Sequence, residues 1–142
     1  MIEKILYKNK LFALIVKGNY RKKKGVNFFT PNNTTQQFGY IKHKKGHVIE
    51  PHQHNKRLTK ILSTTEVILL LKGILRVDFY ENKKKYLFSK IIKEKDIIML
   101  VHGGHGFKIL KNAEMIEVKQ GPYLASDKIK FKTVDEKKIK FK

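Results

Sequence analysis

Short apolar runs recur along this chain, with polar and turn-forming residues between them. Residues 11–16 form the first run, which ends before Gly18. No helix of ordinary length is visible in residues 1–36, and from residue 37 onward short runs follow one another at regular intervals. This pattern predicts seven strands, at residues 37–43, 66–71, 74–80, 85–91, 96–101, 104–110 and 114–120. The turns predicted between them include Lys72-Gly73 and residues 111–113. Short strands at regular spacing are typical of an all-β sandwich or barrel.

The run 66–71 is apolar on both of its faces. Alternate side chains of a strand share a face, and Glu66 is the one polar residue of the six. A strand that is apolar on both sides is covered on both sides. We expect one face to line a barrel and the other to meet a second sheet or a second subunit, which makes a homodimer the expected assembly.

At 142 residues and 16.7 kDa, the chain has the size of one domain with one sizeable core. We expect a single domain over residues 1–142, made of N-terminal strands and a loop (1–36), a barrel core (37–121) and a C-terminal extension (122–142). Gly121-Pro122 marks the last boundary because it breaks the strand before it. Residues 132–142 alternate Lys with apolar residues, so an edge strand and a frayed terminus are both open.

The formal net charge of +20 comes from 32 Lys and Arg residues against 12 Asp and Glu residues. Such a charge can indicate a polyanionic partner. However, 29 of the basic residues are Lys and they are spread along the whole chain, whereas base reading and bidentate phosphate binding favour Arg. We therefore interpret the charge as a solvated, Lys-rich surface that attracts acidic sugars, nucleotides and nucleic acid only nonspecifically.

Other classes of protein are excluded by composition. Cysteine is absent, so the chain has neither disulfides nor a thiolate metal site. No signal-peptide pattern is found at the N-terminus. The apolar runs, including 67–71 and 97–101, are too short to span a membrane. We expect a cytoplasmic protein without a membrane partner.

Two histidines at i and i+2, His52 and His54, are the first candidates for site chemistry. This step turns a helix through about 200°, so the two side chains would not share a helix face. On an extended strand the same step puts both on one face, as a pair aimed into a barrel. With Glu66 and His105 they form three imidazoles and a carboxylate, which suit a divalent metal such as Fe, Mn, Ni, Co or Zn. The alternative is that Glu66 caps a loop in solvent and the histidines make ordinary hydrogen bonds.

Two motifs in this order resemble those of the cupin superfamily. The first motif consists of Gly46, His52-Gln53-His54, Glu66 and Gly73. Five residues separate Gly46 from His52 and six separate Glu66 from Gly73, and both gaps are those of the family. The second keeps Asp96, a glycine at 103 or 104, and His105. The eleven residues 55–65 make the connection between His54 and Glu66 longer than in the common pattern. The resemblance covers residues 37–121.

This resemblance implies a fold and a function. The fold would be a double-stranded β-helix, also called a jelly-roll barrel, and the metal ligands would be His52, His54, Glu66 and His105. Small single-domain cupins of this type are associated with polysaccharide biosynthesis and sugar-nucleotide pathways. The implied function is therefore that of a metal-binding cupin acting on a sugar or sugar nucleotide, in the manner of an isomerase or epimerase. The alternative is a non-catalytic carbohydrate- or metal-binding module, and whether the protein is an enzyme stays open.

Six further residues are candidates for contacts with a substrate, although no catalytic residue is assigned: Arg57, Lys60, His102, Glu117, Lys119 and Tyr123. Arg57 and Lys60 lie between the predicted ligands and would hold a phosphate or carboxylate, or belong to a charged surface loop. His102 belongs to the glycine-rich loop at the expected barrel mouth. Glu117 and Lys119 would be a pair in the barrel lumen or an exposed ion pair. Tyr123 would close over the site or simply pack.

Overall fold

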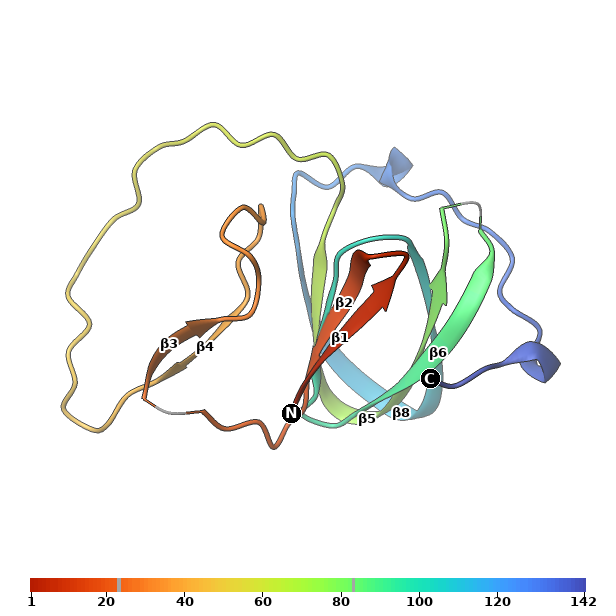
Figure 1. The fold of residues 1–142 in the computed structure, drawn as a ribbon, viewed down its shortest axis with the longest axis horizontal. Helices are drawn as coiled ribbons and strands as arrows, with labels where there is room; N and C mark the ends of the chain where they lie inside the picture. Colours follow the sequence, from red (N-terminus) through yellow and green to blue (C-terminus); the bar gives the residue numbers. More distant parts are fainter. Residues whose placement is uncertain (23, 83) are drawn as a thin grey trace. The chain divides into compact units, whose positions relative to one another are not determined.

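The computed structural model describes residues 1–22, 24–82 and 84–142. This described chain is all-β, as predicted: it has eight strands and two single-turn 3-10 helices, η1 (Ala125–Asp127) and η2 (Glu136–Lys138) (Figure 1). None of its helices is long and apolar enough to cross a membrane. Residues 1–20 and 64–142 form one compact unit and residues 21–63 form a second, and each is described by itself. The predicted single domain therefore stays a prediction.

The first unit is built on one antiparallel sheet. Its strands are β1 (Ile2–Tyr7), β2 (Lys10–Val16), β5 (Glu66–Tyr80), β6 (Tyr86–Lys93), β7 (Ile97–Leu100) and β8 (Gly104–Lys119). They are hydrogen-bonded in the order β1-β2-β7-β5-β6, and β8 pairs with the opposite edge of β5. The apolar run at residues 11–16 forms most of β2, as predicted, whereas the apolar pattern does not identify β1.

Two predicted turns lie inside long strands. Lys72-Gly73 lies within β5, which has 15 residues, and residues 111–113 lie within β8, which has 16. Both predicted turns are wrong, because the two segments face each other across the ladder at the point where its register is irregular. Gly73 has a φ of 95°, and a Cβ there would lie 2.2 Å from the carbonyl oxygen of Asn112. Glycine lets the strands stay paired while they bend, so β5 and β8 curve together (Figure 1).

This bend curls the sheet into a half-barrel around an apolar core. Ile15, Ile98 and Ile68 form one row across β2, β7 and β5, and each is at most 1% exposed. Leu75 and Val77, in the second half of β5, are fully buried in the same cluster. Burial of one such side chain contributes about 1.5–3 kcal/mol. Side chains from both halves of β5 therefore pack in the same core, on the concave face of the curved sheet.

The C-terminal tail packs across the opposite face of β5. Arg76 on β5 is 3% exposed, and its guanidinium donates hydrogen bonds to both carboxylate oxygens of Asp78, at 2.8 and 3.0 Å. The same guanidinium reaches both carboxylate oxygens of Glu136 in the tail, at 2.8 and 3.1 Å. The backbone N–H of Val134 donates to the hydroxyl of Tyr80 at 3.1 Å. Residues 132–142 are thus not a frayed terminus but a strap, held by these side-chain contacts and by one isolated parallel β-bridge between Phe141 and Ser89 of β6.

Glu136 is the carboxylate that connects this strap to the sheet. Its pKa is lowered to about 2, chiefly by the hydrogen bond from Arg76 and then by the one from Lys108. The same contacts with Glu136 and Asp78 raise the pKa of Arg76. The strap therefore depends on an ionised Glu136.

We expect acid to weaken this attachment. A carboxyl whose pKa is lowered by folding stabilises the fold above its usual pKa of 4.5, and that stabilisation is lost as the pH falls toward about 2. Glu136→Gln should therefore unfold at lower urea concentration than wild type at neutral pH. The difference should shrink as the pH is lowered through 4.5, as far as wild type stays folded.

The matched control is Glu94→Gln, which removes a carboxylate that forms a long, 3.7 Å ion pair with the neighbouring Lys95. It should leave the unfolding midpoint unchanged at every pH. A deficit of Glu136→Gln that stays constant with pH would contradict the role of the charge.

The second unit contains a two-stranded antiparallel sheet of β3 (Gly25–Phe28) and β4 (Gly39–Lys42). The strand predicted at 37–43 corresponds to β4. Thr30 and Gln37 close the loop between the two strands, because the Thr30 hydroxyl donates to Gln37 Oε1 at 2.9 Å. Residues 43–63 contain no strand.

Candidate functional site

Glu66 and His105, two of the predicted metal ligands, lie side by side. Glu66 opens β5 and is paired with Lys119, whereas His105 is near the start of β8 and is paired with Phe79. Along a straight ladder, the distance from Glu66 to Phe79 would be roughly 40 Å. In the curled sheet, Oε2 of Glu66 lies 2.9 Å from Nε2 of His105.

This approach depends on β7 and the loop that follows it. Leu100, the last residue of β7, pairs with Glu66, and residues 101–104 carry the chain from there to His105. Gly103 allows this short connection, since its φ is 77° and a Cβ would lie 2.3 Å from the ring of Phe12. The curled sheet and the loop together bring the imidazole to the carboxylate.

The carboxylate of Glu66 is largely buried, with 10% of its side chain exposed, whereas 30% of the His105 side chain is exposed. The hydrogen bond from His105 lowers the pKa of Glu66 and outweighs burial, which raises it. Lys128 and Lys119 lower that pKa further through their charge. Glu66 is therefore ionised at neutral pH. Lys128 is not a candidate from the sequence pattern, because only the return of the tail brings its charge near Glu66.

The hydrogen bond also defines the state of the His105 ring. In the neutral imidazole, donation to Glu66 puts the proton on Nε2 and leaves Nδ1 as an acceptor. Such a nitrogen can take up a proton or bind a metal while the carboxylate holds the ring in place. Two roles for Glu66 are compatible with this geometry: a direct ligand, as predicted, or the carboxylate that orients His105.

Lys119 and Tyr123, two predicted substrate contacts, follow at the end of β8. The ammonium of Lys119 lies 5.4 Å from the centre of the Tyr123 ring, and Tyr123 is 75% exposed. Next to Lys119, Gln120 Oε1 accepts a hydrogen bond from the backbone N–H of Thr65 at 3.2 Å. Because Thr65 precedes Glu66, the segment after β8 is fastened to the start of β5. A cationic side chain and an exposed aromatic ring are thereby held close to the Glu66–His105 pair.

Two other predicted residues of the first unit lie outside this cluster. Glu117 is exposed and pairs with Ile68 in the ladder, and no ion pair joins it to Lys119 in the described part of the chain. His102 packs edge-to-face against Phe12, with ring centres 5.3 Å apart, and lines a separate pocket. Substrate contacts by these two residues stay predictions.

The remaining predicted residues belong to the second unit. His52 and His54 are exposed in a segment without regular structure, so the strand expected to carry them is not found. Their rings are nevertheless neighbours, edge-to-face with centres 5.4 Å apart, and Nδ1 of His52 lies 2.9 Å from the carbonyl oxygen of Glu50. Arg57 and Lys60 are exposed in the same irregular segment.

The donors that lie together supply only part of a metal site. Among the residues that the structure describes, no group of three or more His, Asp or Glu side chains is placed to hold a metal. Glu66 and His105 contribute one oxygen and one nitrogen donor, which fit two positions of a divalent site. The convergence of His52 and His54 with this pair stays a prediction.

Comparison with known proteins adds no relative: no family model matches the chain, and neither a curated protein nor a solved structure matches it. The resemblance to cupins therefore rests on the two sequence motifs.

We expect His105 to control the pKa of Glu66. In His105→Ala the carboxylate loses its hydrogen-bond donor, which is the largest cause of its lowered pKa, while burial continues to raise the pKa. A carbon-13 NMR titration of the Glu66 carboxyl should therefore give a higher pKa in His105→Ala than in wild type. His102→Ala removes a histidine that does not contact Glu66 and should leave that pKa unchanged. An equal effect of both variants would contradict the specific pairing.

Proposed function

We propose that this is a cytoplasmic, metal-binding protein of the cupin type, with a jelly-roll barrel and a site for a small polar ligand. The observation that carries the proposal is the 2.9 Å contact between Glu66 and His105. These residues are 39 positions apart in the chain, and both belong to the motifs that predict the metal ligands. Two predicted co-ligands that meet across a curled sheet support a common site.

The proposed metal is a divalent ion such as Fe, Mn, Ni, Co or Zn. Carboxylate oxygen and imidazole nitrogen are donors that such ions accept. His52 and His54 are proposed as the further imidazoles. When bound, the metal would supply Lewis-acid polarisation of a carbonyl or hydroxyl group. In this proposal Glu66 either binds the metal directly or holds the His105 ring in a binding orientation.

The proposed ligand is a sugar or sugar nucleotide. Lys119 and Lys128 bring positive charge to the neighbourhood of Glu66, which favours a ligand that carries phosphate or carboxylate. His105 has a ring nitrogen able to exchange a proton, as isomerase- or epimerase-like chemistry requires. The exposed ring of Tyr123 offers an apolar face beside these polar groups.

The second candidate is a non-catalytic carbohydrate- or metal-binding module. The exposed Tyr123 ring beside Lys119 favours it, because an aromatic face and a cation bind a polar ligand without any proton transfer. Incubation of the metal-loaded protein with a keto-sugar nucleotide separates the two candidates. Turnover that is lost in His105→Ala supports the enzyme, whereas saturable binding without turnover supports the module.

We expect the metal site to depend on four side chains. Elemental analysis of the protein purified after metal loading should find bound metal in wild type and little in His105→Ala or in the His52→Ala/His54→Ala double variant. Loss of a residue that only hydrogen-bonds to a metal ligand typically lowers metal affinity about 10–100-fold. Loss of a ligand itself should therefore lower the affinity by a factor of about ten or more. Glu66→Gln should retain more metal than the histidine variants.

The matched control is the His43→Ala/His47→Ala double variant, which removes a second histidine pair of the same unit, stacked with ring centres 3.8 Å apart. It should retain the metal of wild type. Full metal content in His52→Ala/His54→Ala, or equal loss in the control, would refute the proposed ligands.

We also propose a homodimer formed through the face of β5 and β8 that points away from Glu66. On this face Val67 lies opposite Val118 and Leu69 lies opposite Ile116. Ile116 is 50% and Val118 55% exposed, which is unfavourable for a solitary sheet face. A second copy would cover these apolar rows.

The dimer is tested by light scattering after size-exclusion chromatography. The Ile116→Thr/Val118→Thr double variant should be monomeric at concentrations where wild type is dimeric, because it removes apolar area while keeping β-branched side chains. Ile109→Thr is the control, since Ile109 is also 50% exposed but lies on the other face of β8. A monomeric wild type, or equal dissociation of the control, would overturn the proposed interface.

A further inference from the structure

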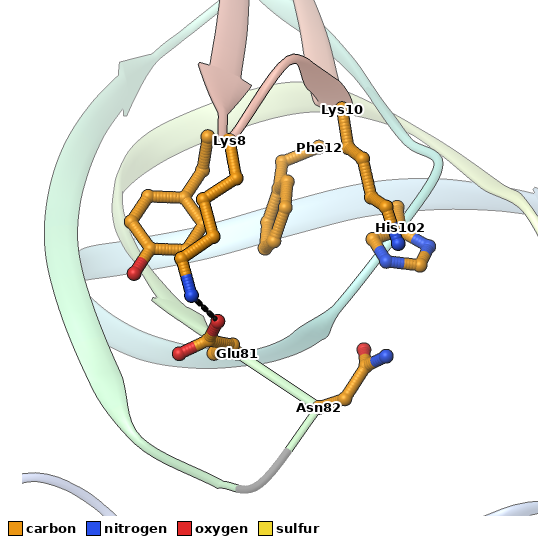
Figure 2. Close-up of a pocket in the computed structure, with 7 residues that line it drawn as sticks. Lys8, Lys10, Phe12, Glu81, Asn82 and His102 are labelled. Carbon is orange, nitrogen blue, oxygen red and sulfur yellow. Dashed lines mark hydrogen bonds and ion pairs between the residues drawn. The ribbon is translucent and has the colours of Figure 1, made fainter.

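A pocket lies at one end of the first unit. It is formed where the β1–β2 hairpin, the end of β5 and the loop after β7 meet, and its volume is about 70 Å³ (Figure 2). Lys8 and Lys10 extend into it from the hairpin, and Glu81 and Asn82 border it from the segment after β5. None of these residues takes part in the contact between Glu66 and His105.

The charges around this pocket do not cancel. Lys8 is neutralised by Glu81, whose carboxylate lies 2.6 Å from the Lys8 ammonium and raises the pKa of that lysine. The side chain of Lys10 makes no hydrogen bond or ion pair among the described residues. The pocket therefore keeps one uncompensated positive charge, on a flexible side chain that can adapt to a ligand.

The floor of the pocket is rigid and carries further donors. Phe12 is 2% exposed and packs against the edge of the His102 ring. The backbone N–H groups of Val101 and His102 both donate to the Phe12 carbonyl, at 2.8 and 3.3 Å. Together with the close approach of Gly103 to the Phe12 ring, these bonds hold the His102 imidazole at the pocket. The ring and the side-chain amide of Asn82 are both able to donate hydrogen bonds.

We propose that this pocket binds one small oxyanion, a phosphate group, through Lys10, His102 and Asn82. A phosphate group carries several strong acceptor oxygens in a tetrahedral arrangement. Hydrogen-bond donors that come from three separate chain segments can approach these oxygens from different directions, whereas the two oxygens of a carboxylate lie in one plane. The small volume suits a single such group. Lys8 and Glu81 border the site as a fixed ion pair.

The test is an NMR titration of isotope-labelled full-length protein with two probes, inorganic phosphate and glycerol 3-phosphate, at constant ionic strength set with sodium chloride. Saturable shifts confined to Lys10, His102, Asn82 and their neighbours are expected. Lys10→Gln should weaken binding about tenfold, which corresponds to about 1.4 kcal/mol. Tighter binding of glycerol 3-phosphate identifies the phosphate of an organic molecule as the ligand, whereas equal or weaker binding identifies free phosphate.

Lys111→Gln is the matched control, because it removes one positive charge from an exposed position on β8 and should leave binding unchanged. Equal weakening in both lysine variants would reveal general attraction to the basic surface and overturn the proposal, as would shifts that do not saturate. The same titration of metal-free and metal-loaded wild type should give the same phosphate affinity. Phosphate binding and metal binding can therefore fail independently of each other.

Discussion

The bend shared by β5 and β8 is the constraint on which the rest of the first unit depends. Both strands stay paired past an irregular stretch of the ladder, where Gly73 passes so close to the Asn112 carbonyl that a side chain cannot fit. Without the bend the ladder would be long and open, with Glu66 and His105 at opposite ends. With it the sheet curls, the core closes on one side, and the two side chains meet at 2.9 Å.

A second condition is the cover on the outer face of β5. Arg76 and Asp78 are buried there, and a buried ion pair is tolerated only when its hydrogen-bonding groups are satisfied. Glu136 supplies the missing acceptors from the tail, and Ser89 donates to Asp78 at 2.5 Å. The tail is therefore a structural part of the half-barrel, and its return also brings Lys128 close enough to act on Glu66.

Several of the carboxylates of this basic chain are engaged in ion pairs. Glu81 neutralises Lys8, Asp96 binds Lys17 at 3.0 Å, and Glu136 binds Arg76. The excess positive charge is consequently left to unpaired lysines. At the Glu66–His105 pair that charge surrounds one ionised carboxylate, whereas at the pocket beside Phe12 the described residues form no ion pair with the Lys10 side chain. At both places the excess lysine charge therefore favours an anionic group of a ligand.

The amino-acid sequence by itself determined the all-β class, the positions of most strands and the chemistry of Glu66 and His105, because alternation and donor type are local properties. It predicted turns at Lys72-Gly73 and at residues 111–113, since glycine and polar residues have the same local signature in a turn and in a bulge. Only the tertiary structure decided that these segments pair with each other and that the tail straps Arg76. It also decided that Lys10 and His102 share a pocket. Such contacts join residues far apart in the chain, and their free energy comes from packing and charge in the folded state, which no local pattern encodes.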